Sequence, residues 1–144
     1  MGAGTGYYAF AVAECLLPEG RLEILDHDRE ILDRTMSGAR ARGISCVEIT
    51  LGDACSLPYP DERFDGAYII TTLGELRDQV AALRELRRVL KPSGRLVVGD
   101  FLGDPHVVTF RRLCSRAEEA GLRFERRLGG PLGYFARFTP EPAA

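Results

Sequence analysis

Three glycines at alternate positions open the chain, and an aspartate follows at a defined distance. Gly2, Gly4 and Gly6 lie in the stretch MGAGTG. Residues without a Cβ atom allow a backbone turn to pass close beneath a bound ligand. Asp26 ends the stretch RLEILD, at about the offset of 20 residues where a carboxylate accepts hydrogen bonds from ribose hydroxyls. The turn and the carboxylate together favour a nucleotide site.

Two further strand ends carry polar side chains. Asp53, in Gly52-Asp53-Ala54, is suited to accept a hydrogen bond from an exocyclic amine, and Thr71 follows a long apolar stretch. Each feature also has a simpler structural explanation. Glycine clusters occur in many turns, Asp26 is suited to cap a helix, and Asp53 is a common residue type in a turn. The spacing of the glycines and both carboxylates favours the nucleotide site over these explanations.

The type of nucleotide follows from the glycine spacing. A dinucleotide fold places its third glycine five positions after the first, where this chain has Tyr7. No cationic residue near the turn is available for a phosphate. Two carboxylates suit a cationic adenosine without phosphates. These features indicate S-adenosylmethionine as the cofactor.

Hydrophobic periodicity predicts the elements that position these residues. Helices are expected at 7–17, 29–43 and 106–121, and a further helix from Arg77 to a stop at Pro92 and Gly94. Strands are expected at 21–26, 45–53, 67–73, 95–101, 122–128 and 133–139. This alternation predicts an α/β fold, a Rossmann-like doubly wound, mostly parallel sheet that ends in an antiparallel hairpin. Helix 7–17 is apolar on most sides and is expected to be buried. Strand 67–73 is expected to be covered on both faces.

Composition narrows the class of protein. The chain has 144 residues and a formal net charge of -2, which fits one domain and argues against a nucleic-acid partner. We expect no membrane span, because the apolar stretches are too short. The four scattered cysteines are expected to be buried free thiols, and no metal site is expected. The interpretation is a cytoplasmic protein.

Longer motifs resemble one family, the class I S-adenosylmethionine-dependent methyltransferases. The similarity is greatest to the branch of ubiquinone and menaquinone C-methyltransferases, or methyltransferase type 11. GAGTG resembles the family's glycine motif, GDACSLPYPDERFDGAYI its GDA-x-x-LPFPD-x-x-FD stretch, and RVLKPSGRL its RVLKPGGRL turn. The resemblance implies that Asp26 binds ribose, that His27 packs on adenine, and that Asp53 and Ala54 lie at the adenine. It implies a methyltransferase domain over residues 1–139 and a tail over 140–144.

The start of the chain departs from the family pattern. The family has a buried first strand that ends in an acidic residue before the glycine motif, whereas only Met1 precedes Gly2 here. We therefore expect the fold to lack the family's first strand and to be weakened. Direct pairing of the flanking strands, or a homodimer through the gap, would then satisfy the exposed backbone groups.

The expected activity is methyl transfer to a small-molecule acceptor by in-line displacement, in which the protein mainly aligns the reactants. No catalytic base is assigned, because Glu75, Asp100 and His106 each have a structural explanation as loop or strand-end residues. One alternative is a non-catalytic, truncated remnant or interaction module. A less favoured alternative is an NAD-dependent oxidoreductase, against which Tyr7 argues.

Overall fold

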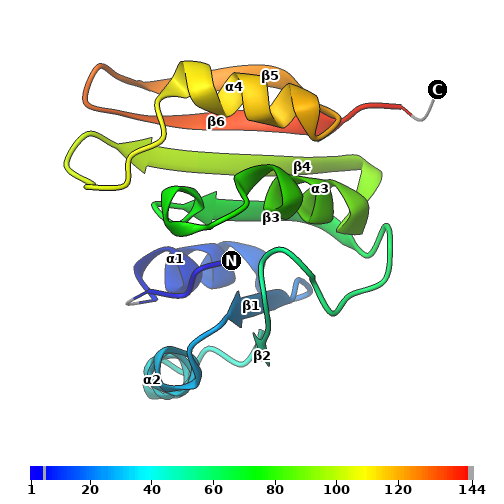
Figure 1. Cartoon of the computed structure of the whole chain (residues 1–144). Helices are drawn as coiled ribbons and strands as arrows, with labels where there is room; N and C mark the ends of the chain where they lie inside the picture. Colours follow the sequence, from blue (N-terminus) through cyan, green and yellow to red (C-terminus); the bar gives the residue numbers. More distant parts are fainter. Residues whose placement is uncertain (5, 143–144) are drawn as a thin grey trace. The chain divides into compact units, whose positions relative to one another are not determined.

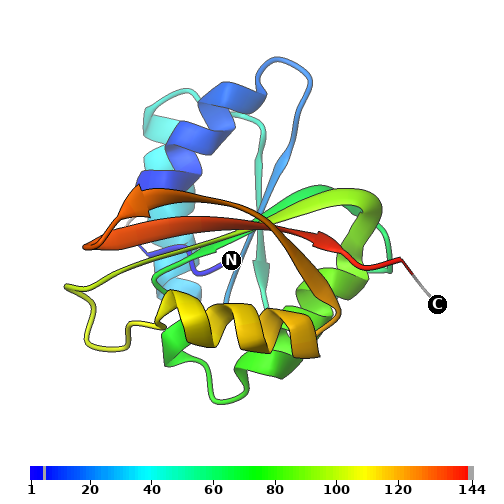
Figure 2. The ribbon, with the colours of Figure 1, turned by 90° about the horizontal axis from the view of Figure 1, so that it is seen from above.

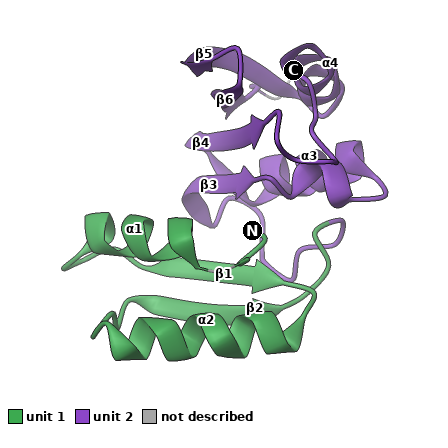
Figure 3. Cartoon of the chain, turned by 90° about the vertical axis from the view of Figure 1, so that its left-hand side faces the viewer, with its two compact units in different colours: residues 1–54 green, residues 55–144 purple. Residues whose placement is uncertain are grey.

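The computed structural model describes residues 1–4 and 6–142 (Figure 1). The chain separates into two compact units, residues 1–54 and residues 55–144 (Figure 3). No helix in the described ranges is long and apolar enough to cross a bilayer. The two units are described separately.

The first unit contains two helices and a two-stranded parallel sheet. Its elements are α1 (Tyr7–Leu16), β1 (Leu22–Asp26), α2 (Arg29–Ala41) and β2 (Val47–Leu51). Ile24 on β1 pairs with Ile49 on β2. The carboxylate of Asp28 accepts hydrogen bonds from the amides of Glu30 and Ile31 and thereby caps the start of α2.

The second unit is a four-stranded sheet with helices on one face. Its elements are β3 (Phe64–Ile70), the 3₁₀ helix η1 (Leu73–Glu75), α3 (Gln79–Val89), β4 (Leu90–Phe101), α4 (Phe110–Glu119), β5 (Leu122–Gly130) and β6 (Gly133–Pro140). The strand order is β3-β4-β6-β5. β3 and β4 are parallel, and the C-terminal hairpin is antiparallel. Figure 2 shows α3 and α4 on the same side of this sheet.

The core of the second unit lies between its sheet and these helices. Val98 pairs with Ala136, and Leu96 pairs with Phe138; all four side chains are buried. Leu83 of α3 and Leu113 of α4 are fully buried too. The apolar periodicity of both helices therefore matches the face that they bury.

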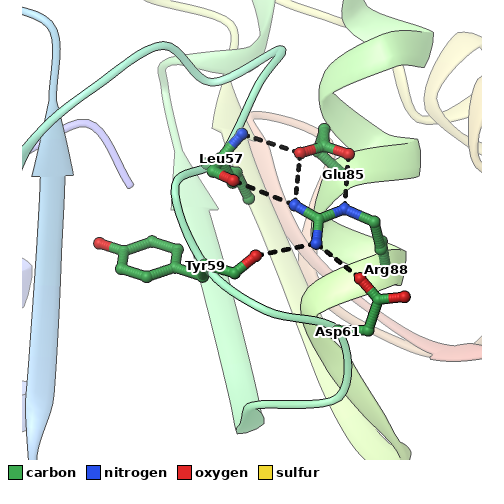
Figure 4. Close-up of polar contacts among 5 residues, drawn as sticks. All are labelled: Leu57, Tyr59, Asp61, Glu85 and Arg88. Carbon is green, nitrogen blue, oxygen red and sulfur yellow. Dashed lines mark hydrogen bonds and ion pairs between the residues drawn. The ribbon is translucent and has the colours of Figure 1, made fainter.

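A network around Arg88 fastens the loop before β3 to α3 (Figure 4). The guanidinium donates to both carboxylate oxygens of Glu85, at 2.8 and 2.7 Å, and to the carbonyl oxygens of Leu57 and Tyr59, at 3.0 and 2.8 Å. It also donates to Asp61, and Glu85 accepts the amide of Leu57. The planar donor array of arginine suits such a set of acceptors. The network fixes the course of residues 57–61.

The predicted α/β class and the C-terminal hairpin are confirmed. In the described part of the chain no strand precedes the glycine turn, and the strands form two separate sheets. β1 has only β2 as a described partner, and β3 has only β4. The direct pairing of flanking strands that the sequence suggested is absent from these described sheets.

Several local predictions were wrong. Helix α1 is largely exposed, since only Ala9 and Ala13 are buried and Tyr7 is 75% exposed. Strand β3 ends at Ile70 and is only partly covered, since within the second unit the helices α3 and α4 lie on one side of the sheet. Helix α4 begins at Phe110 because the hydroxyl of Thr109 caps it.

The cysteines also differ from the expectation. All four are thiols rather than disulfides, as predicted, but Cys15 is exposed and Cys46, Cys55 and Cys114 are half-buried. In the predicted C-terminal tail, Pro140 belongs to β6, and residues 143–144 lie outside the described ranges.

Candidate cofactor site

The glycine turn adopts the backbone conformation that only glycine takes easily. Gly2, Gly4 and Gly6 have φ angles of 76°, 50° and 80°, in the left-handed region. The amide of Gly2 donates to the carbonyl of Leu25 at 3.0 Å, so the turn is attached to the end of β1. A Cβ atom at Gly4 would have no heavy atom within 4 Å. The backbone there is open to a ligand; Thr5 lies outside the described residues.

Asp26 connects this turn with the loop after β1. Its Oδ2 accepts the amide of Ala3 at 2.8 Å, and its Oδ1 accepts the amide of Asp28 at 3.0 Å. Nδ1 of the exposed His27 lies 3.2 Å from the same Oδ1. The Asp26 side chain is only 7% exposed, so these hydrogen bonds compensate for its lost hydration.

The turn that contains Asp53 meets the same strand end. The amide of Gly52 donates to the carbonyl oxygen of Asp26 at 3.0 Å. Asp53 is exposed at the end of β2, and Ala54 beside it is buried. The first unit therefore brings the segments of the glycine turn, Asp26, His27, Asp53 and Ala54 together at the carboxyl ends of β1 and β2.

Thr71 belongs to the second unit, directly after β3. Its amide donates to the carbonyl of Gly99 at 2.9 Å, and its hydroxyl donates to the carbonyl of Ile70 at 2.8 Å. Its φ angle is 52°, which is unfavourable for a β-branched residue. Strained backbone of this kind is concentrated at functional sites, and the strain was not visible in the sequence.

Asp100 acts as a structural anchor. Its Oδ1 accepts the amide of Phe101 at 2.9 Å, and its Oδ2 accepts the amide of Val108 at 2.8 Å. Burial raises the pKa of this carboxyl. The hydroxyl of Tyr134 donates to the carbonyl of Val108, and burial together with the nearby Asp100 raises the pKa of Tyr134. These contacts hold the loop between β4 and α4, a role that sequence reasoning did not assign to Tyr134.

The other two acid–base candidates are also loop residues. Glu75 is exposed in η1. His106 is exposed, its amide donates to Asp104 at 2.7 Å, and its Nδ1 lies 3.9 Å from the same carboxylate. Neither observation gives these residues a chemical role.

The backbone and carboxylate groups of the first unit suit S-adenosylmethionine as a ligand. Gly4 offers an open backbone, and the buried carboxylate of Asp26 lies against the same turn. The exposed Asp53 adds a second carboxylate, and a cationic ligand without phosphates requires no basic residue.

Comparison with known families decides the assignment. A family model described as a methyltransferase domain matches residues 1–94. The chain belongs to this methyltransferase domain family. The match contains every candidate site residue, from Gly2 to Thr71.

Named relatives of this methyltransferase domain support the same family assignment. The chain is 36% identical over 110 residues to a demethylmenaquinone methyltransferase of Geobacillus kaustophilus, and the aligned part is 76% of this chain and 47% of that protein. It is 34% identical over 110 residues to the enzyme of the same name from Anoxybacillus flavithermus, with 76% and 46% covered. The chain thus spans about half the length of these relatives.

Solved structures share the fold of the methyltransferase domain. A SAM-dependent methyltransferase from Aquifex aeolicus superposes with a TM-score of 0.88 at 23% identity, over 95% of this chain and 78% of that one. The [4+2]-cyclase SpnF gives a TM-score of 0.86 at 21% identity, with 99% and 73% covered. The family and these folds imply S-adenosylmethionine as the cofactor.

Proposed function

We propose that the chain binds S-adenosylmethionine through the first unit and serves the transfer of its methyl group to a small, apolar acceptor. The observation that carries the proposal is the buried Asp26 carboxylate, which holds the amide of Ala3 in the glycine turn at 2.8 Å. The family match supports the reaction class. The nicotinamide alternative has no support in that match.

Asp26 retains capacity for a ligand. A carboxylate has about four lone-pair positions, and each of its oxygens accepts one backbone amide here. Nδ1 of His27 also lies 3.2 Å from Oδ1, so this proposal assigns the ribose hydroxyls to the remaining positions, chiefly on Oδ2. In this proposal His27 packs on the adenine, and Asp53 and Ala54 lie beside its amino group.

Bound there, S-adenosylmethionine supplies a methyl group on a sulfonium sulfur, already activated for displacement. The task of the protein is to orient the ligand, to align the acceptor and to exclude water. Thr71 is proposed as a further cofactor contact because of its strained backbone. The acceptor class rests on the relatives named demethylmenaquinone methyltransferase, and we propose a quinone-like ring system.

Calorimetric titration with S-adenosylhomocysteine tests the cofactor site. We expect saturable binding to the chain and a loss of at least tenfold in affinity for Asp26→Ala, since hydrogen bonds to a charged group contribute about 1.5–3 kcal/mol. Asp33→Ala, an exposed aspartate of α2, is the matched control and should bind normally. Absence of heat with the unmodified chain would contradict the proposal.

The alternative is a non-catalytic module. It predicts binding of S-adenosylhomocysteine without methylation of a demethylmenaquinone analogue by S-adenosylmethionine. Transfer of a radiolabelled methyl group to that analogue would exclude this alternative.

A homodimer is a further part of the proposal. β1 and β3 each have a described partner strand on one side only, and an unpaired strand edge is suited to bind another strand. Sedimentation velocity over a range of concentrations should show a reversible dimer. A monomer at all concentrations would refute this assignment.

A further inference from the structure

Two neighbouring loops of the second unit expose large apolar side chains. Leu102, in the loop after β4, is 59% exposed, and Leu132, in the turn between β5 and β6, is 74% exposed. Phe101, Leu128 and Phe135 add exposures of 49%, 53% and 39%. We call these five residues the apolar tip. They are half of the ten exposed large apolar residues found in the described ranges.

Backbone contacts hold the two loops of the apolar tip together. The amide of Leu102 donates to the carbonyl of Leu132 at 2.9 Å. Phe101 pairs with Gly133 across the β4–β6 ladder, and Leu128 pairs with Phe135 across the hairpin. Figures 1 and 2 show both loops at the same end of the sheet. The five residues therefore lie at one end of the sheet.

The surroundings of the apolar tip are basic. Of the four arginines in residues 122–140, Arg123 lies toward the other end of the hairpin, opposite Thr139, and Arg137 pairs with Glu125. Arg126 and Arg127 immediately precede Leu128 and are exposed. Arg111 and Arg112 lie at the start of α4, which has no acidic residue in its first turn. The loop between β4 and α4 adds one acidic residue, Asp104, so Arg111, Arg112, Arg126 and Arg127 remain a local excess of positive charge in a chain with a net charge of -2.

We propose that the apolar tip and its arginines form a docking surface for an anionic phospholipid bilayer. Exposed leucine and phenylalanine side chains gain free energy by entering the acyl boundary, while arginines beside them contact lipid phosphates. A second copy of the chain fits this surface poorly, because a two-fold contact would bring equivalent arginines together. This role goes beyond cofactor binding and methyl transfer and does not depend on either.

Vesicle sedimentation with the full chain tests the docking surface. Vesicles of phosphatidylcholine alone are compared with vesicles containing one quarter phosphatidylglycerol. We expect binding to the anionic vesicles that weakens with added salt, since the surface potential of the lipid is screened. Replacing both Leu102 and Leu132 by serine should reduce the partition coefficient at least tenfold, because both lose their apolar contact with the acyl region.

Arginine variants test the electrostatic contribution to vesicle binding. Among the described residues, Arg111 and Arg126 form no side-chain hydrogen bond or ion pair, so Arg111→Gln with Arg126→Gln should preserve the fold. We expect about fivefold weaker binding for each arginine removed. Leu17→Ser and Arg40→Gln alter an exposed leucine and an exposed arginine of the first unit and should bind like the unmodified chain.

Three results would overturn the inference. The first is no sedimentation of the unmodified chain with anionic vesicles. The second is equal loss of binding in the control variants, with circular dichroism unchanged. The third is a dimer in vesicle-free solution that Leu132→Ser dissociates, because the apolar tip would then be a contact between copies.

Discussion

The carboxylate of Asp26 lies 2.8 Å from the amide nitrogen of Ala3, so an acidic side chain at the end of β1 fixes the backbone of the glycine turn. The second oxygen of the same carboxylate holds the amide of Asp28, which caps α2. Local stability therefore depends on this side chain, and in the function proposed above cofactor affinity depends on it as well.

Asp26→Asn tests the contribution of this carboxylate to stability. An amide has one acceptor oxygen, so one backbone amide loses its partner and faces an NH₂ group. We expect the free energy of unfolding to fall by about 1–3 kcal/mol, measured by urea denaturation. Asp33→Asn, on the exposed part of α2, should change it by less than about 0.5 kcal/mol. Equal stability of the Asp26 variant and the unmodified chain would show that the contacts do not form.

Thr71→Gly should stabilise the second unit. The left-handed conformation at φ 52° costs a β-branched residue roughly 1–2 kcal/mol, and glycine adopts it without that cost. Glycine also loses more entropy on folding, so we expect a net gain of about 0.5–1 kcal/mol in thermal denaturation. If Thr71 contacts the cofactor, affinity for S-adenosylhomocysteine falls at the same time.

Thr72→Gly is the matched control for this substitution. Thr72 has a φ of -117°, where glycine relieves no strain, so the variant should be destabilised. A loss of stability for both variants would contradict the strain at Thr71.

Gly74→Ala should destabilise the second unit. A Cβ atom at residue 74 would lie 1.7 Å from the carbonyl oxygen of His106, and this backbone oxygen cannot rotate away. Overpacking of this kind costs typically about 1–3 kcal/mol, measurable as a lower midpoint in urea. Gly130→Ala places a Cβ atom with no heavy atom within 4 Å and should leave the midpoint unchanged. A tolerated Gly74→Ala would mean that η1 and the loop at His106 lie farther apart.

The Glu85–Arg88 pair predicts acid sensitivity of the 57–61 loop. The hydrogen bonds from Arg88 hold the pKa of Glu85 below its usual value of 4.5. A depressed pKa in the folded state contributes stability that is present above the unfolded pKa and is lost as the pH falls through the folded value. We therefore expect faster proteolysis of this loop below about pH 4.5. Glu85→Gln should remove much of that pH dependence, and an unchanged profile would refute the role of the pair.

The sequence allowed the element order and the strand-end carboxylates to be predicted, because both depend on local pattern. Asp26 follows an apolar strand and precedes a helix, so its place at a strand end was visible. Contacts between distant segments were not visible. The approach of Gly74 to His106 and the binding of residues 57–61 by Arg88 arise only when strands and helices pack. The exposure of Tyr7 was missed because apolar composition does not show which side of a helix is covered.

Asp100 joins the amides of Phe101 and Val108, the two ends of the segment between β4 and α4. That segment is thus a loop closed at its base by a single buried carboxylate. Solvent-exposed side chains between the two ends can change while the sheet beneath keeps its register, as long as the amide of Leu102 keeps its bond to Leu132 and the backbone at His106 keeps its place beside Gly74. Substitutions there can therefore alter the surface that this loop presents without any change in the strands that support it.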